Sequence, residues 1–156
     1  HLSGCFLNKR LNRNNDGGTT RRTTDIFQLA TTVLFQNPVQ NFALAPNNLK
    51  DVSPVCMDYM KTVPTTWDET CFIDGYPGKY VVLARRHGNT WYLAAVNAGK
   101  EIVKLKLDLD MFAGKTVSLY KDDKKGEPQL VTLKVKESGK VQLEILPQGG
   151  VVLVNN

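Results

Sequence analysis

The sequence predicts a mainly β protein, in which one or two helices precede an antiparallel β-sandwich or barrel of about eight strands. Two observations lead to this fold class. Apolar residues recur at a helical spacing near 3.6 before Val63, and at the strand spacing of 2 after Trp67. Short turns rich in glycine and aspartate separate the alternating segments, and no long crossover is present that would join parallel strands.

The helical part follows a polar stretch, residues 1–22, in which residues 12–18 predict a loop. Thr23 and Thr24 are candidate N-caps, and the apolar periodicity over 26–34 predicts a helix buried on more than one side. Asn37-Pro38 ends or kinks it, and residues 39–43 indicate another turn or two of helix. A second helix is predicted between Ser53 and Val63, because Pro54 suits the first helical position after a serine cap.

The β part contains alternating segments joined by short turns. The expected strands lie at 71–73, 80–85, 91–96, 103–109, 117–119, 131–135, 141–145 and 151–154. His87-Gly88-Asn89-Thr90 predicts a tight hairpin turn between two of them. In the segment 103–109 valine and leucines alternate with charged residues, which is typical of a strand with one wet face.

We divide the chain into residues 1–62, a loop with helices, and residues 63–156, an antiparallel β domain. The first part is too small to bury a core alone. The apolar helix over 23–43 therefore needs a partner. That partner is either the β domain, a catalytic part outside the chain, or a second copy that hides an otherwise exposed apolar patch.

Composition and charge exclude several classes of function. No run of about 18 apolar residues occurs, so no membrane span is expected. The chain begins at His1 without a leader, from which we expect a trimmed product or a piece of a larger one. The formal net charge is +5, and the basic residues near the N-terminus are Lys9, Arg10, Arg13, Arg21 and Arg22. A phosphate-binding arm is one interpretation, but no aromatic residues interleave with these charges, so a solvated loop is favoured and no nucleic acid is expected.

The cysteines and histidines do not predict a metal or a nucleophile. The three cysteines, Cys5, Cys56 and Cys71, form no CxxC pair and no disulfide framework. Only His1 and His87 are available as imidazole ligands, so neither a zinc site nor a cysteine nucleophile with a histidine base is expected.

Two strings in the middle of the chain are specific. The first is Val63-Pro64-Thr65-Thr66-Trp67-Asp68-Glu69-Thr70, and the second is Gly78-Lys79-Tyr80-Val81-Val82-Leu83-Ala84-Arg85-Arg86. A further string, Leu146-Pro147-Gln148-Gly149-Gly150, lies near the C-terminus. Together with Gln28-Leu29-Ala30 and Asn37-Pro38-Val39-Gln40, they resemble the C-terminal region of glycoside hydrolase family 97, the SusB-like α-glucosidases and α-galactosidases. The resemblance covers the chain from about Thr23 to its end.

The resemblance implies an enzyme much larger than this chain. The family joins an N-terminal β-sandwich, a central (β/α)8 barrel and a small C-terminal β domain, and a barrel alone needs about 250 residues. Residues 1–62 would be the end of the barrel. The calcium-binding and catalytic carboxylates of the family would lie upstream, so no catalytic, cofactor-binding or metal-binding residue is assigned here. A periplasmic or secreted location follows from the resemblance only.

Several groups of polar residues are candidates for chemistry. Asp68 and Glu69 are adjacent and would point to opposite faces of a strand, which does not suit an acid/base pair. We expect them to bond backbone groups or a basic residue such as Arg85 or Arg86. Asp122, Asp123 and Glu127 lack the spacing of a calcium loop, so a solvated turn is expected. Asp16-Gly17-Gly18 could line a sugar site at the barrel rim, and Gly149-Gly150 is expected to be a bulge or turn, not a phosphate cradle.

Two functional hypotheses remain. The first is a non-catalytic C-terminal portion of a family 97 glycosidase, whose whole form would cleave α-glucosidic or α-galactosidic bonds with calcium. It would brace the barrel and support oligomerisation. The alternative is a carbohydrate-binding module that stacks an oligosaccharide on aromatic rings. The candidate rings are Trp67, Tyr76, Tyr80, Trp91 and Tyr92, although core packing is favoured for most of them.

Overall fold

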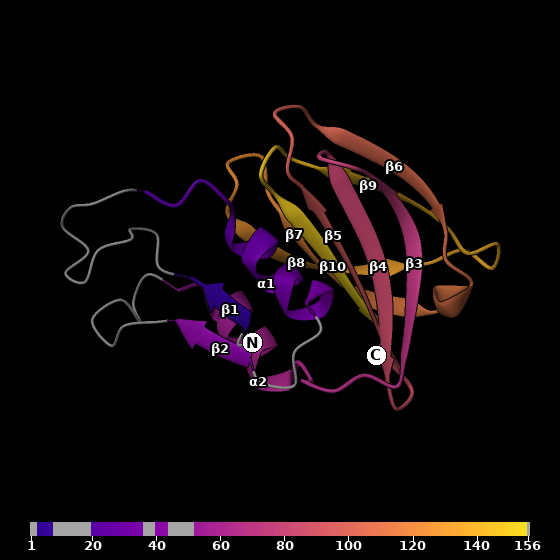
Figure 1. Cartoon of the computed structure of the whole chain (residues 1–156). Coiled ribbons are helices and arrows are strands. Elements are labelled where there is room, and N and C mark those ends of the chain that lie inside the picture. The colour runs from indigo at the N-terminus through magenta and orange to yellow at the C-terminus, as the bar shows by residue number, and fades with distance from the viewer. Residues whose placement is uncertain (1–2, 8–19, 36–39, 44–51, 156) are drawn as a thin grey trace.

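The computed structural model describes residues 3–7, 20–35, 40–43 and 52–155 (Figure 1). Two strands and two helices come first, in the order β1 (Ser3–Phe6), α1 (Asp25–Leu34), β2 (Gln40–Ala43) and α2 (Pro54–Thr62). Eight strands follow: β3 (Glu69–Tyr76), β4 (Tyr80–His87), β5 (Thr90–Asn97), β6 (Val103–Asp108), β7 (Thr116–Asp122), β8 (Pro128–Lys134), β9 (Lys140–Ile145) and β10 (Gly150–Asn155). A short 3-10 helix, η2 (Asp110–Phe112), lies between β6 and β7.

The eight later strands form an antiparallel sandwich, which confirms the predicted fold class. Six of them make one sheet in the order β3-β4-β5-β10-β7-β8, and β6 pairs with β9 in a second sheet. Along β6 and β9 buried and exposed residues alternate strictly from Lys104 and Lys140 onward, as a strand with one wet face requires. Apolar side chains from both sheets, with Phe112 of η2, fill the core between them.

Asn97 ties the two sheets together through a buried side chain. It ends β5, and its Nδ2 donates to the carbonyl oxygens of Glu101, at 2.7 Å, and of Ile145 on β9, at 3.1 Å. Its Oδ1 accepts from the backbone N–H of Gly99 at 2.9 Å. Since Asn97 is fully buried, these three bonds replace the water that the amide would otherwise bind.

The N-terminal part contains two strands that the sequence did not predict. β1 and β2 pair in parallel, with Ser3 opposite Gln40 and Phe6 opposite Ala43, and α1 is the crossover between them. The expected continuation of helix over 39–43 is wrong, because residues 40–43 form β2. A four-residue strand carries too little periodicity to be recognised, and its partner lies far away in the sequence. The chain thus begins with a βαβα arrangement.

The first helix lies between two sheets. α1 contacts β1 on one side and both β5 and β10 on the other, so the β1–β2 pair, α1 and the six-stranded sheet form successive layers (Figure 1). Thr24 caps the helix by accepting from the N–H of Phe27, which confirms the cap prediction. Ile26, Leu29, Ala30 and Val33 are fully buried. Among the described residues of α1 no large apolar side chain is exposed, whereas Phe35 just after its end is exposed.

The second helix packs beside the first. Ser53 caps α2 and Pro54 opens it, as predicted, and Tyr59 is buried with its hydroxyl 2.9 Å from Oγ1 of Thr32 on α1. The Tyr59 ring also meets the ring of Tyr120 on β7 at 5.1 Å. Neither described helix is long and apolar enough to span a bilayer.

Candidate interaction surfaces

The junction of α1 with the six-stranded sheet is built on a glycine. A Cβ atom at Gly150, the first residue of β10, would lie 2.9 Å from Cα of Phe27 and 3.0 Å from the carbonyl oxygen of Ile26. Both are backbone atoms, which cannot give way as a flexible side chain would. Glycine is therefore required here for the close approach of helix and strand. The predicted turn before it is confirmed, since the N–H of Gly149 donates to the carbonyl of Leu146.

A half-buried carboxyl group joins three elements at this junction. Oδ2 of Asp122, at the end of β7, accepts from the backbone N–H of Gly150 at 3.1 Å and from the hydroxyl of Thr24 at 3.1 Å. Its Oδ1 is buried and has no hydrogen-bond partner among the described residues. Burial raises the pKa of Asp122 to about 6, although both hydrogen bonds oppose that shift.

The two aspartates of the acidic turn, Asp122 and Asp123, point in different directions. Asp123 faces the turn, where its Oδ1 accepts from the N–H groups of Lys125 and Glu127 at 2.8 and 3.0 Å. Asp122 points inward instead, which the sequence did not reveal. Because the two carboxyl groups serve different contacts, they do not converge on a calcium ion. No group of three or more His, Cys, Asp or Glu side chains with metal-binding geometry occurs in the described part of the chain.

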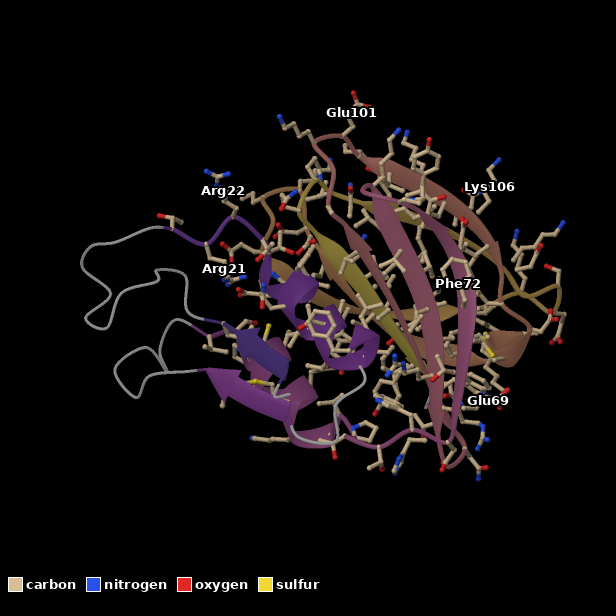
Figure 2. The ribbon with its side chains drawn as sticks, viewed as in Figure 1. Arg21, Arg22, Glu69, Phe72, Glu101 and Lys106 are labelled. Carbon is tan, nitrogen blue, oxygen red and sulfur yellow. The ribbon has the colours of Figure 1, made fainter. Side chains whose placement is uncertain are left out.

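Asp68 and Glu69 take the structural role that was expected of them. Oε2 of Glu69 accepts from Nε of Arg86 at 3.2 Å, and Asp68 Oδ2 accepts from the N–H of Gly88 at 2.8 Å. Arg86 Nη1 lies 3.9 Å from the Asp68 carboxylate. Both carboxylates are thus engaged at the start of β3, with Arg86 as the basic partner; Glu69 is labelled in Figure 2.

The five candidate aromatic residues do not share a face. Trp67 and Tyr92 meet edge to face at 5.3 Å on the helix side of the sheet, whereas Tyr80 and Trp91 pack against the core between the sheets. Only Tyr76 is exposed, and Nζ of Lys79 lies 4.9 Å from its ring centroid. A stacking platform needs several open rings on one surface, so this arrangement favours packing over sugar binding.

The remaining candidates are either engaged or lie outside the described residues. Arg21 forms an ion pair with Asp25 on α1 and donates to the carbonyl of Thr23 at 2.7 Å, while Arg22 points outward (Figure 2). Cys56 is buried and Cys71 half-buried, and neither forms a disulfide within the described part of the chain. Outside the described residues lie His1, Lys9, Arg10, Arg13 and Asp16-Gly17-Gly18.

Comparison with known proteins places the chain. Residues 66–155 match the family model described as "Glycosyl-hydrolase 97 C-terminal, oligomerisation". A retaining alpha-galactosidase of Bacteroides thetaiotaomicron is 28% identical in an alignment of 135 residues. The alignment covers 81% of this chain and 20% of that protein. A probable retaining alpha-galactosidase of Streptomyces bingchenggensis is 33% identical over 76 residues, and the alignment covers 49% of this chain and 12% of that protein.

Solved structures agree over nearly the whole chain. A beta-arabinopyranosidase is 84% identical with a TM-score of 0.94, over 97% of this chain and 24% of that one. A family 97 enzyme from Pseudoalteromonas sp. strain K8, in complex with acarbose, is 26% identical with a TM-score of 0.78. That superposition covers 97% of this chain and 25% of the chain of the enzyme. The chain spans a quarter or less of the length of these relatives. It belongs to glycoside hydrolase family 97 and contains the C-terminal oligomerisation domain of that family.

Proposed function

We propose that this chain is the non-catalytic C-terminal portion of a family 97 glycosidase and that it braces the catalytic barrel. The observation that carries the proposal is α1, which contacts β1 and the sandwich at once and shares an apolar cluster with Leu7, the residue after β1. The order β1-α1-β2-α2 is that of two successive βα units of a barrel. In this interpretation α1 packs against the barrel strands and also against the β domain.

The β1–β2 pair supports this proposal because parallel strands rarely stand alone. Among the described residues each of the two strands has one neighbour, and two-stranded parallel sheets are marginal in water. Further parallel strands on both outer edges would complete a barrel wall.

The chain's own carboxylates support a non-catalytic role. Glycoside hydrolysis needs two carboxyl groups on either side of the bond, about 5 to 10 Å apart. Asp68 and Glu69 are instead engaged with Gly88 and Arg86 at the end of the sandwich. We infer that the acid and the nucleophile or base come from upstream residues, together with any calcium that the whole enzyme needs.

For the substrate of the whole enzyme, the 84% identity to a beta-arabinopyranosidase outweighs the 28% identity to a retaining alpha-galactosidase. We infer that the whole enzyme cleaves β-arabinopyranosidic bonds, with α-galactosidic and then α-glucosidic bonds as the next candidates. A periplasmic or secreted location is proposed from the family resemblance alone.

The test compares the whole enzyme with the 156-residue chain on the nitrophenyl β-arabinopyranoside, α-galactoside and α-glucoside. Hydrolysis by the whole enzyme alone is expected, with the arabinopyranoside fastest and with activity lost on chelation of calcium. Hydrolysis by the purified chain would overturn the non-catalytic assignment. Sedimentation velocity on the whole enzyme, with and without residues 66–155, tests oligomerisation: removal should reduce the assembly to monomers.

A further inference from the structure

The helix-facing side of the six-stranded sheet is only partly covered. α1 lies mainly over β5 and β10 and reaches β4 where Arg85 bonds Leu34, and α2 lies near β8, but no described helix makes a comparable contact with β3. Resting on the proposed function, we propose that the helix of the βα unit immediately upstream of β1 in the whole enzyme packs on β3 and β4 beside α1. It also supplies the missing hydrogen-bond acceptors of Arg85.

An apolar groove marks the place. Val81 and Leu83 point to the helix side of β4, and Phe72 lies opposite Leu83 on β3. Phe72 is 68% exposed, although its ring leans over Gly75, where a Cβ atom would lie 3.1 Å from Cζ of the ring. The groove has a volume of about 360 Å³ and continues to Val96 on β5. Figure 2 shows Phe72 on β3, away from both helices.

A buried cation with free donors lies on the same face. Arg85 follows Val81 and Leu83 on the helix side of β4 and is only 3% exposed. Its Nη2 donates to the carbonyl oxygen of Leu34 in the last turn of α1 at 3.2 Å, while Nε and Nη1 have no partner among the described residues. Because a buried guanidinium loses its water, unmade bonds of this kind are strongly unfavourable, and further acceptors are expected.

The spacing of the helices predicts where the next one falls. Packed helices lie about 8–10 Å apart and neighbouring strands about 4.8 Å apart, so one helix step equals about two strands. From α1, above β5 and β10, one step in one direction leads to β7 and β8, where α2 lies and Tyr59 meets Tyr120. One step in the other direction leads to β3 and β4. In a barrel, the helix on that side of α1 belongs to the preceding unit.

The orientation of such a helix suits Arg85. Helices of successive βα units run parallel, so their carboxyl-terminal ends lie at the same end of the layer. Arg85 already binds a carbonyl at the carboxyl-terminal end of α1. The last four carbonyls of a helix have no partner within it and carry the negative end of its dipole. The carboxyl-terminal turn of the upstream helix would thus present acceptors to Nε and Nη1.

A second copy of the chain is the competing occupant, since β3 is an edge strand and the domain is one of oligomerisation. The length of the related enzymes and the burial of Arg85 both favour the upstream helix. The chain covers 24–25% of the related enzymes, which leaves ample chain for a third unit. Arg85 is buried further along β4 than the groove, so its acceptors have to stay in place in every oligomeric state.

The test is photocrosslinking in the whole enzyme, with Phe72 replaced by p-benzoylphenylalanine. The expected product keeps the mass of one chain, and its crosslinked peptide maps within the roughly 30–40 residues that precede β1, the length of one βα unit. Lys106, exposed on β6 of the opposite sheet (Figure 2), is the control site and should give no such crosslink. A product of two chains, a crosslink elsewhere, or none would each overturn the proposal.

A second measurement separates this inference from the proposed function. Phe72→Asp should lower the Tm of the whole enzyme and leave that of the 156-residue chain nearly unchanged, whereas Lys106→Asp should change neither. Equal shifts in both proteins would refute an upstream contact. The proposed function fails on a different readout, namely absence of glycosidase activity in the unsubstituted whole enzyme.

Discussion

The carboxyl group of Asp122 makes the stability of the chain depend on pH in an unusual direction. Its pKa is raised from 3.8 to about 6 by burial, so the folded state holds a proton that the unfolded state has released. Its contribution is therefore fully present below about pH 3.8 and is lost as the pH rises through about 6. Asp122→Asn removes this titration and keeps one oxygen to accept from Gly150 and Thr24.

The magnitude follows from the size of the shift. A difference of about two pKa units corresponds to about 3 kcal/mol, and solvent screening at the half-open side chain reduces it to about 2 kcal/mol. We expect Asp122→Asn to gain about 2 kcal/mol over the unsubstituted chain between about pH 4 and pH 7.5.

Urea unfolding of both proteins across this range measures that difference, because subtraction removes the pH dependence that the two proteins share. Asp108→Asn, the same substitution at an exposed position on β6, is the matched control. A flat difference for Asp122→Asn would mean that Asp122 titrates near its ordinary pKa, and the burial argument would then be refuted.

Three further substitutions test the packing, each by equilibrium unfolding. Gly150→Ala should destabilise by about 1–3 kcal/mol, since the added Cβ meets the backbone of Phe27 at 2.9 Å; an unchanged midpoint would contradict the close approach. Asn97→Leu should destabilise by about 2–3 kcal/mol because two carbonyls and one N–H lose their buried partner; a loss below about 0.5 kcal/mol would show that water replaces the amide. Tyr59→Phe should cost only about 1 kcal/mol, since the Thr32 hydroxyl still donates to the carbonyl of Leu29 at 2.6 Å; a loss above about 3 kcal/mol would indicate a larger network.

The β domain could be predicted because its signals are local. Alternation along β6 and β9, the two-residue hairpin turn after His87 and the caps at Thr24 and Ser53 all depend on neighbours within a few residues. By contrast, β2 depends on a partner 37 positions earlier in the chain, Ser3 opposite Gln40. The sequence predicts helix for these four residues because one turn of helix and one short strand have similar apolar patterns.

The features of the candidate surfaces were harder to predict. The sequence offers Arg85 or Arg86 as a partner for the acidic pair, and the structure pairs Arg86 with Glu69. The inward orientation of Asp122 and the burial of Arg85 were not predictable, since each results from which element crosses above the strand. Gly150 carries a sequence signal, because a glycine in a strand often marks a bulge or the close approach of another backbone. Only the position of α1 explains it.

The layer that α1 occupies has a consequence for cooperativity. One apolar cluster combines Leu7, Ile26 and Cys56 from the N-terminal part with Tyr92 and Val152 from the sandwich. A cut in the gene near residue 63 would therefore divide a single core and leave an uncovered apolar surface on both products. We expect native-state hydrogen exchange to find α1, β5 and β10 opening together as one unit, although the sequence pattern changes between the helix and those two strands.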